Sequence, residues 1–138
     1  MQVRVRQCAH ILERFGLAMA GAASGLFVAI HVGSSISALT SQAFLLVMML
    51  LGAVGFYLGI DTPQLAFPKT GGSTRRIDAA EFLSAVGTFL ATLVAFFSVG
   101  VIVLRSEPDI AWTAAIMAGW VLGVAMQIVA GTIARTRA

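Results

Sequence analysis

The stretch "GLAMAGAASGLFVAIHVGSS", residues 16–35, decides the fold of this chain. It contains no Asp, Glu, Lys or Arg, and as a helix it is long enough to cross about 30 Å of hydrocarbon. Small residues recur at every fourth position beside a single histidine, His31. Because residues four apart share one face of a helix, the pattern predicts a membrane span with a flat packing face. That face consists of Gly21, Gly25, Ala29 and Gly33.

The composition of the whole chain indicates the same class of protein. Of its 138 residues, 59% are hydrophobic and only 11% are charged, whereas about a quarter of a soluble domain is charged. Three more apolar segments follow the first, each near the length of a membrane span. We therefore predict an all-α fold, a four-span transmembrane helix bundle that forms one integral membrane domain over residues 1–138. The predicted spans are 15–36, 42–60, 82–104 and 111–134.

The positive charges orient this bundle. If all four spans cross, Arg105 is the single cation on one side, and the remaining eight lie on the other side. Loops rich in Lys and Arg stay in the cytoplasm, so we predict two antiparallel helical hairpins in the inner membrane, with both termini and the loop 61–81 cytoplasmic. A cleaved signal peptide is the alternative for the first span, but its apolar stretch exceeds the usual length. The eight cations are Arg4, Arg6, Arg14, Lys69, Arg75, Arg76, Arg135 and Arg137.

The loops carry structural signals rather than catalytic ones. Asp78 and Glu81 have the spacing of a capping box, which predicts a helix start at the third span. Pro108 is expected to stop that span from continuing into the fourth. Three cations of the long loop are predicted to bind anionic lipid headgroups. They are Lys69, Arg75 and Arg76.

Small-residue faces are not confined to the first span. The second and fourth spans repeat glycine at steps of four, and Gly and Ala faces let helix backbones approach closely in lipid. A four-helix bundle has little interior, so some of these faces are expected to meet another subunit in a homo- or hetero-oligomer. The further packing residues are Gly55, Gly59, Gly119 and Gly123.

Polar side chains within the spans are the candidates for function. Ser24, His31, Thr88 and Gln127 form a candidate polar pathway. Three readings of His31 stay open: a structural hydrogen bond to a neighbouring helix, a haem or metal ligand completed by another subunit, and a proton or solute pathway. The amide of Gln127 needs partners in lipid and is expected to bond another helix, with the Ser/Thr face of the third span as one candidate.

No catalytic, metal or dinucleotide motif is present in the sequence, so we predict neither an enzyme nor a resident cofactor, and no nucleic-acid partner. The leading hypothesis is a non-catalytic accessory or assembly subunit that packs against a larger membrane complex or itself. A homo-oligomeric transporter or channel for a small solute or ion is the first alternative. A haem- or quinone-binding electron-transfer subunit is the second.

Overall fold

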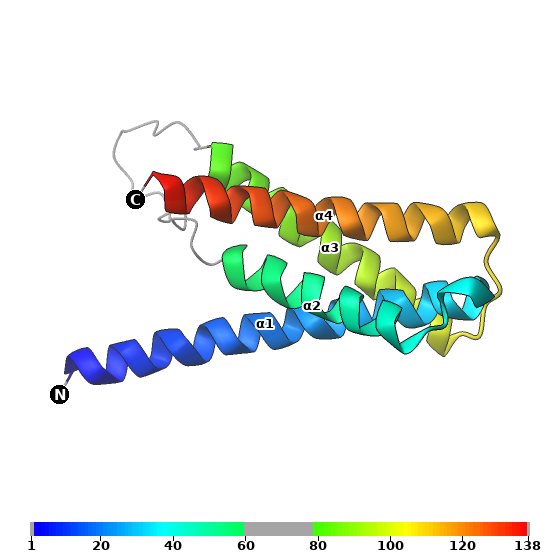
Figure 1. Ribbon diagram of the computed structural model, residues 1–138, viewed down its shortest axis with the longest axis horizontal. Coiled ribbons are helices and arrows are strands. Elements are labelled where there is room, and N and C mark those ends of the chain that lie inside the picture. Colours follow the sequence, from blue (N-terminus) through cyan, green and yellow to red (C-terminus); the bar gives the residue numbers. More distant parts are fainter. Residues whose placement is uncertain (1, 60–78, 138) are drawn as a thin grey trace.

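The computed structural model describes residues 2–59 and 79–137, and all regular structure in these ranges is helical. Four α-helices run along a common axis, and a short 3₁₀ helix links the first two (Figure 1). Each α-helix is long and apolar enough to cross a membrane. The protein is thus a multi-pass helical bundle by length and composition. The elements are α1 (Gln2–Ser35), η1 (Ser37–Leu39), α2 (Gln42–Gly59), α3 (Ala79–Val103) and α4 (Ile110–Thr136).

The helix bounds agree with the predicted spans except at the start of α1. The sequence predicts a span from residue 15, but the helix begins at Gln2, and its apolar part extends over Ile11–Ser35. The difference arises because charge ends a hydrophobic run without ending a helix, and Arg is a good helix former. The other three helices begin or end within a few residues of the predicted spans.

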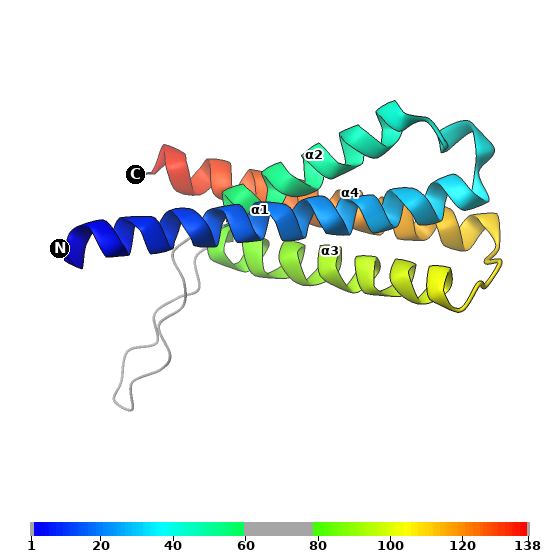
Figure 2. The ribbon, with the colours of Figure 1, turned by 90° about the horizontal axis from the view of Figure 1, so that it is seen from below.

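The bundle has two distinct ends. Both termini lie at one end, the termini end, and the connections 36–41 and 104–109 lie at the other, the loop end (Figures 1 and 2). α1 packs most extensively against α2, and α3 packs most extensively against α4. α1 also runs between α2 and α3 and contacts α4 (Figure 2). Two faces of α1 are therefore covered, one by α2 and one by the other pair.

Glycines stand where helix backbones meet. A Cβ atom added to Gly21 would collide with the backbone carbonyl of Gly52, and one added to Gly52 would collide with that of Gly21. At the α3–α4 crossing, a Cβ on Gly87 would lie 2.6 Å from the Gly123 carbonyl oxygen. Lipid provides no hydrophobic force between helices, so these backbone approaches supply the van der Waals contact that holds each pair.

The turn from α3 to α4 is closed by backbone hydrogen bonds. The Ser106 N–H donates to the Val101 carbonyl at 3.1 Å, and the Arg105 N–H donates to the Ile102 carbonyl at 3.2 Å. This is the Schellman pattern, which normally has glycine where Arg105 stands. Arg105 has φ of 50°, a left-handed conformation that costs a non-glycine residue about 1–2 kcal/mol. The helix ends at Val103, one residue before the predicted end of this span at 104, and this cap is what ends it; Pro108 follows in the connection to α4.

Aromatic side chains mark the two ends. At the termini end, Arg14 donates a hydrogen bond to the Tyr57 hydroxyl at 3.4 Å, and its guanidinium lies 5.4 Å from the ring centroid. The Arg135 guanidinium lies 6.0 Å from the same centroid. Trp112 is half exposed at the loop end. Tyr57 and Trp112 thus lie toward opposite ends, as interfacial aromatic anchors do.

Substituting alanine for glycine is expected to have opposite effects at two positions of α1. Gly16 has nothing within 4 Å of an added Cβ, whereas that atom at Gly21 meets the Gly52 backbone. Gly16→Ala should raise the free energy of unfolding by about 0.5–1 kcal/mol because alanine favours helix. Gly21→Ala should lower it by about 1–3 kcal/mol because the two backbones must separate. Thermal unfolding in detergent measures both, and equal effects would contradict the glycine contact.

Candidate functional site

Polar and hydrogen-bonding side chains face one another along the inside of the bundle. Their spacing is seven residues on α1 and α4 and fourteen residues on α3, which keeps them on one seam of each helix. Each is less than 8% exposed, although the surrounding core is apolar. We call this set the polar seam. Its members are Ser24 and His31 on α1, Ser84 and Ser98 on α3, and Thr113, Trp120 and Gln127 on α4.

The part of the polar seam nearest the termini end is hydrogen-bonded between helices. Gln127 Nε2 donates to Thr88 Oγ1 at 2.8 Å, and the Thr88 hydroxyl donates to the Ser84 carbonyl at 2.8 Å. Ser84 Oγ donates to the Gly59 carbonyl of α2 at 3.4 Å. The predicted bond from Gln127 to the Ser/Thr face of the third span is thus present. Gln127 Oε1 has no partner among the described residues.

The middle of the polar seam is filled by Trp120. Its ring is fully buried, and Nε1 donates to Ser24 Oγ at 3.2 Å. The Ser24 hydroxyl in turn donates to the Gly21 carbonyl at 2.8 Å. The indole Cζ2 atom would also lie 3.1 Å from a Cβ atom added to Gly25 or to Gly52. Trp120 therefore occupies the point where α1, α2 and α4 come closest and separates the two ends of the seam.

Among the described residues, no hydrogen bonds link the side chains of the polar seam nearest the loop end to one another. His31, Ser98 and Thr113 are each fully buried, within about two turns of the ends of their helices. The Ser98 backbone lies close enough to the imidazole for a weak hydrogen bond. Neither ring nitrogen has a partner of good hydrogen-bond geometry among the described residues, 2–59 and 79–137. The Ser98 and Thr113 hydroxyls likewise have no partner in those ranges. We call these three residues the unpaired layer.

Desolvation makes the unpaired layer costly. A buried polar group without a hydrogen bond costs about 1–3 kcal/mol, and this layer holds the Ser98 and Thr113 hydroxyls and at least one imidazole nitrogen in that condition. His31 is eight residues beyond the middle of the span Ile11–Ser35, which places it about 12 Å from the middle of the membrane. At that depth, buried polar groups are commonly met by water or by a ligand. The layer therefore has the chemistry of a binding site.

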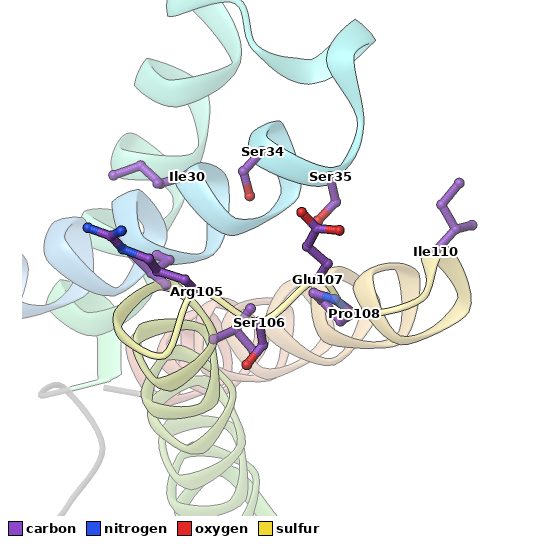
Figure 3. A pocket seen from close by; sticks show the side chains of 10 residues that line it. Ile30, Ser34, Ser35, Arg105, Ser106, Glu107, Pro108 and Ile110 are labelled. Atoms are coloured by element: carbon purple, nitrogen blue, oxygen red, sulfur yellow. The ribbon is translucent and has the colours of Figure 1, made fainter.

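A cavity of about 480 Å³ lies at the loop end, next to the last turn of α1. Figure 3 shows side chains from α1, the 104–109 connection and the start of α4 around it. Ser34 and Ser35 line it, and their hydroxyls donate to the His31 carbonyl at 2.7 and 3.2 Å. Arg105 and Glu107 also line it. The cavity is thus one helical turn away from the unpaired layer along α1.

The four predicted pathway residues lie inside the bundle. Ser24, His31 and Gln127 are buried, and Thr88 is half-buried beside Gln127. They do not form one cluster, because Trp120 stands between His31 and the pair of Gln127 and Thr88. The loop cations Lys69, Arg75 and Arg76, and the capping residue Asp78, lie outside the described residues.

The predicted packing glycines contact helices of their own chain. Gly25 approaches the Met48 backbone, and Gly123 approaches the Ala91 amide nitrogen, 2.8 Å from an added Cβ. A Cβ atom added to Gly33 would lie 3.2 Å from the Leu39 carbonyl oxygen. Ala29 is fully buried. The others contact side chains of neighbouring helices within 4 Å of the added atom: Gly55 meets Val124 and Gln127, Gly59 meets Ser84, and Gly119 meets Val94.

The metal and haem readings of His31 meet a geometric difficulty. A ligand from a second subunit must reach an imidazole that is fully buried between helices of one chain. Within the described residues, no group of three or more His, Cys, Asp and Glu side chains is arranged to hold a metal ion. The arrangement suits a small polar guest in the bundle interior better than a large planar cofactor.

Ser98 and Thr113 do not stand out in the sequence. Single hydroxyl residues in apolar helices usually bond to their own backbone, as Thr92 does with the Thr88 carbonyl at 2.8 Å. The signal that identifies them is the fourteen-residue spacing, two heptads, from Ser84 to Ser98 and from Thr113 to Gln127. It becomes meaningful only when the three helices are known to face one another.

Comparison with known proteins yields no relative. No protein-family model matches the chain, and neither a curated protein nor a solved structure matches it. The chemistry of the site therefore has to be argued from its own residues.

Two threonine-to-valine substitutions are expected to shift stability in opposite directions. Thr113→Val removes a buried hydroxyl without a protein partner and should raise the free energy of unfolding by about 1 kcal/mol. Thr88→Val removes a hydroxyl that both donates and accepts, and should lower it by about 1 kcal/mol. Unfolding of both variants in one detergent measures the difference. A loss of stability at Thr113 as large as that at Thr88 would show that its hydroxyl is paired.

Proposed function

We propose that this protein is a small multi-pass carrier of the bacterial inner membrane, which binds a small polar solute in the polar seam and moves it between the two sides. The observation that supports this is the unpaired layer of His31, Ser98 and Thr113. A bound solute supplies the hydrogen bonds that the chain itself does not make there. The cavity at the loop end lies one helical turn from this layer along α1, and in the proposed carrier the solute approaches from that side.

The packing in the middle of the bundle favours a carrier over an open channel. Trp120 is fully buried and closes the seam between the unpaired layer and Gln127. Its side chain is linked to α1 by one hydrogen bond, to Ser24 at 3.2 Å. Separating α1 from α4 here costs this bond, about 1 kcal/mol, together with the packing of the indole against α1. Movement at this contact would expose the same site to the other side.

The proposed orientation places the termini end in the cytoplasm. Arg14, Arg135 and Arg137 lie at that end, whereas Arg105 is the one cation of the described ranges at the loop end. This distribution matches the enrichment of Lys and Arg on the cytoplasmic side. The chain then crosses the membrane as two antiparallel hairpins with both termini inside, and the cavity opens toward the outside.

The accessory-subunit hypothesis has less support from the geometry. It rested on small-residue faces left over for another subunit, but Gly25 and Gly123 face helices of the same chain. The outward surfaces carry large apolar side chains, such as Phe89 and Phe96, which are 66% and 73% exposed. Lipid solvates such side chains, and they do not by themselves favour a protein partner. Assembly of several copies, as expected for a small transporter, stays a prediction.

Cysteine labelling tests the carrier proposal without knowledge of the solute. In a Cys8→Ser background, Thr113→Cys and Gln127→Cys place one thiol on each side of Trp120, and Phe96→Cys places a thiol toward lipid. We expect a membrane-impermeant thiosulfonate to label Thr113→Cys from outside and Gln127→Cys from inside, because water reaches each half of the seam in turn. Phe96→Cys should be labelled from neither side. If the two core thiols are as inert as the lipid-facing one, the proposal fails.

A further inference from the structure

The cavity at the loop end has two chemically opposite walls. Figure 3 shows the Arg105 side chain directed toward Ile30 and the Glu107 carboxylate directed toward Ser35. The two charges are only two residues apart in the chain, yet neither forms an ion pair with a residue that the structure describes. Opposite charges held apart across a cavity leave each one available to a guest.

Hydrogen-bond donors lie on the Arg105 wall of the cavity, and hydrogen-bond acceptors lie on the Glu107 wall. A guanidinium only donates hydrogen bonds, so the Arg105 wall selects an oxyanion. On the other wall, the Ser34 and Ser35 hydroxyl hydrogens are already used, because both donate to the His31 carbonyl. Their oxygens are left as acceptors beside the Glu107 carboxylate, and that combination selects an ammonium group.

The remaining surface of the cavity is mainly aliphatic, with one further hydroxyl, that of Ser106. Val101, Ile102 and Ile110 contribute aliphatic side chains beside the charged groups. If the guest carried both charges but no aliphatic part, these aliphatic side chains would stay in contact with water. The lining therefore fits a molecule with an oxyanion, a primary ammonium and an aliphatic part.

The backbone of Arg105 is a second, independent observation. The residue adopts φ of 50° at a helix cap where glycine is unstrained. Strained backbone that persists in a structure often marks a position where the side chain is needed for function. Here the left-handed conformation turns the chain at the rim of the cavity, and glycine would supply that turn without supplying a guanidinium.

From these observations we infer that the cavity binds a zwitterion, with its oxyanion on Arg105 and its primary ammonium between Glu107 and the Ser34 and Ser35 oxygens. Two sources carry this chemistry: a free aliphatic amino acid outside the membrane, and the headgroup of a phosphatidylethanolamine in the adjoining leaflet. The inference names the class of solute for the proposed carrier and rests on that function only for the later step of passage. Binding in the cavity itself requires no transport.

The test measures binding of L-leucine to the full chain in phosphatidylglycerol nanodiscs, with isoamylamine and isocaproate as guests that lack one charge. We expect each single-charge analogue to bind at least about tenfold more weakly than leucine, because each loses one charge-assisted contact. Repeating the titration in phosphatidylethanolamine nanodiscs separates the two sources. An unchanged affinity assigns the site to the free amino acid, and a tenfold loss assigns it to the lipid headgroup.

Three variants connect the binding to the named residues. Arg105→Gly and Arg105→Ala both remove the guanidinium, but only glycine relieves the left-handed strain. Both should weaken binding by at least about tenfold, whereas only Arg105→Gly should raise the melting temperature, by roughly 2–4 °C. Glu107→Gln should weaken the binding of leucine and leave that of isocaproate unchanged. This divergence separates loss of binding from loss of folding.

Several outcomes would overturn the inference. One is the absence of leucine binding in phosphatidylglycerol combined with no preferential retention of phosphatidylethanolamine by mass spectrometry. Another is equal binding of the single-charge analogues, and a third is binding that survives in Arg105→Ala. None of these results depends on the cysteine labelling of the seam, so a failure here is distinguishable from a failure of the carrier proposal. Conversely, leucine binding with an inert seam would support the cavity and remove the carrier.

Discussion

The close approach of α1 and α2 at Gly21 and Gly52 is the contact on which the rest of the bundle depends. In lipid, two apolar helices gain little from hiding apolar surface, so they are held by atomic contact over a long interface. The absence of side chains at these two positions lets each backbone lie against the other. Gly87 and Gly123 perform the same task for α3 and α4. A side chain at either crossing would displace whole helices rather than a local group.

These crossings also determine which faces of the helices turn inward. With its glycine face against α2, α1 turns Ser24 and His31 toward α3 and α4. The spacing of these groups by seven or fourteen residues on each of the three helices then aligns polar groups with polar groups along the axis. Toward the termini end these groups satisfy one another, as Gln127 does with Thr88. Toward the loop end they do not, and this asymmetry is the feature that points to function.

The two ends of the seam therefore have different energetic roles. The bonds of Gln127, Thr88 and Ser84 tie α2, α3 and α4 together, as hydrogen bonds between membrane helices do. The unpaired layer lowers stability and gains nothing from the protein itself. Arg105 repeats this pattern at the rim of the cavity, where a strained residue occupies a glycine position. Sites that bind ligands often carry such local costs, because the compensating interactions come from the ligand.

The sequence by itself determined the number of helices, their approximate bounds and their membrane character. Each depends on local quantities, namely the length of an apolar run and the absence of charge within it. It also identified the glycine faces and the need of Gln127 for a partner on another helix. It placed the end of the third span within one residue of Val103, but it did not identify the Arg105 turn that caps the helix there.

Only the tertiary structure decided which partner each face meets. The same glycine stripe suits a helix of its own chain or of another subunit, because helical periodicity specifies a face and not its neighbour. Ser98 and Thr113 were overlooked for the same reason, since an isolated hydroxyl usually bonds to its own helix. Their importance arises from the simultaneous burial of His31 on a helix distant in sequence, and burial is a property of the assembled bundle. Local pattern thus determines what each helix is, and the packing of all four determines what the protein can bind.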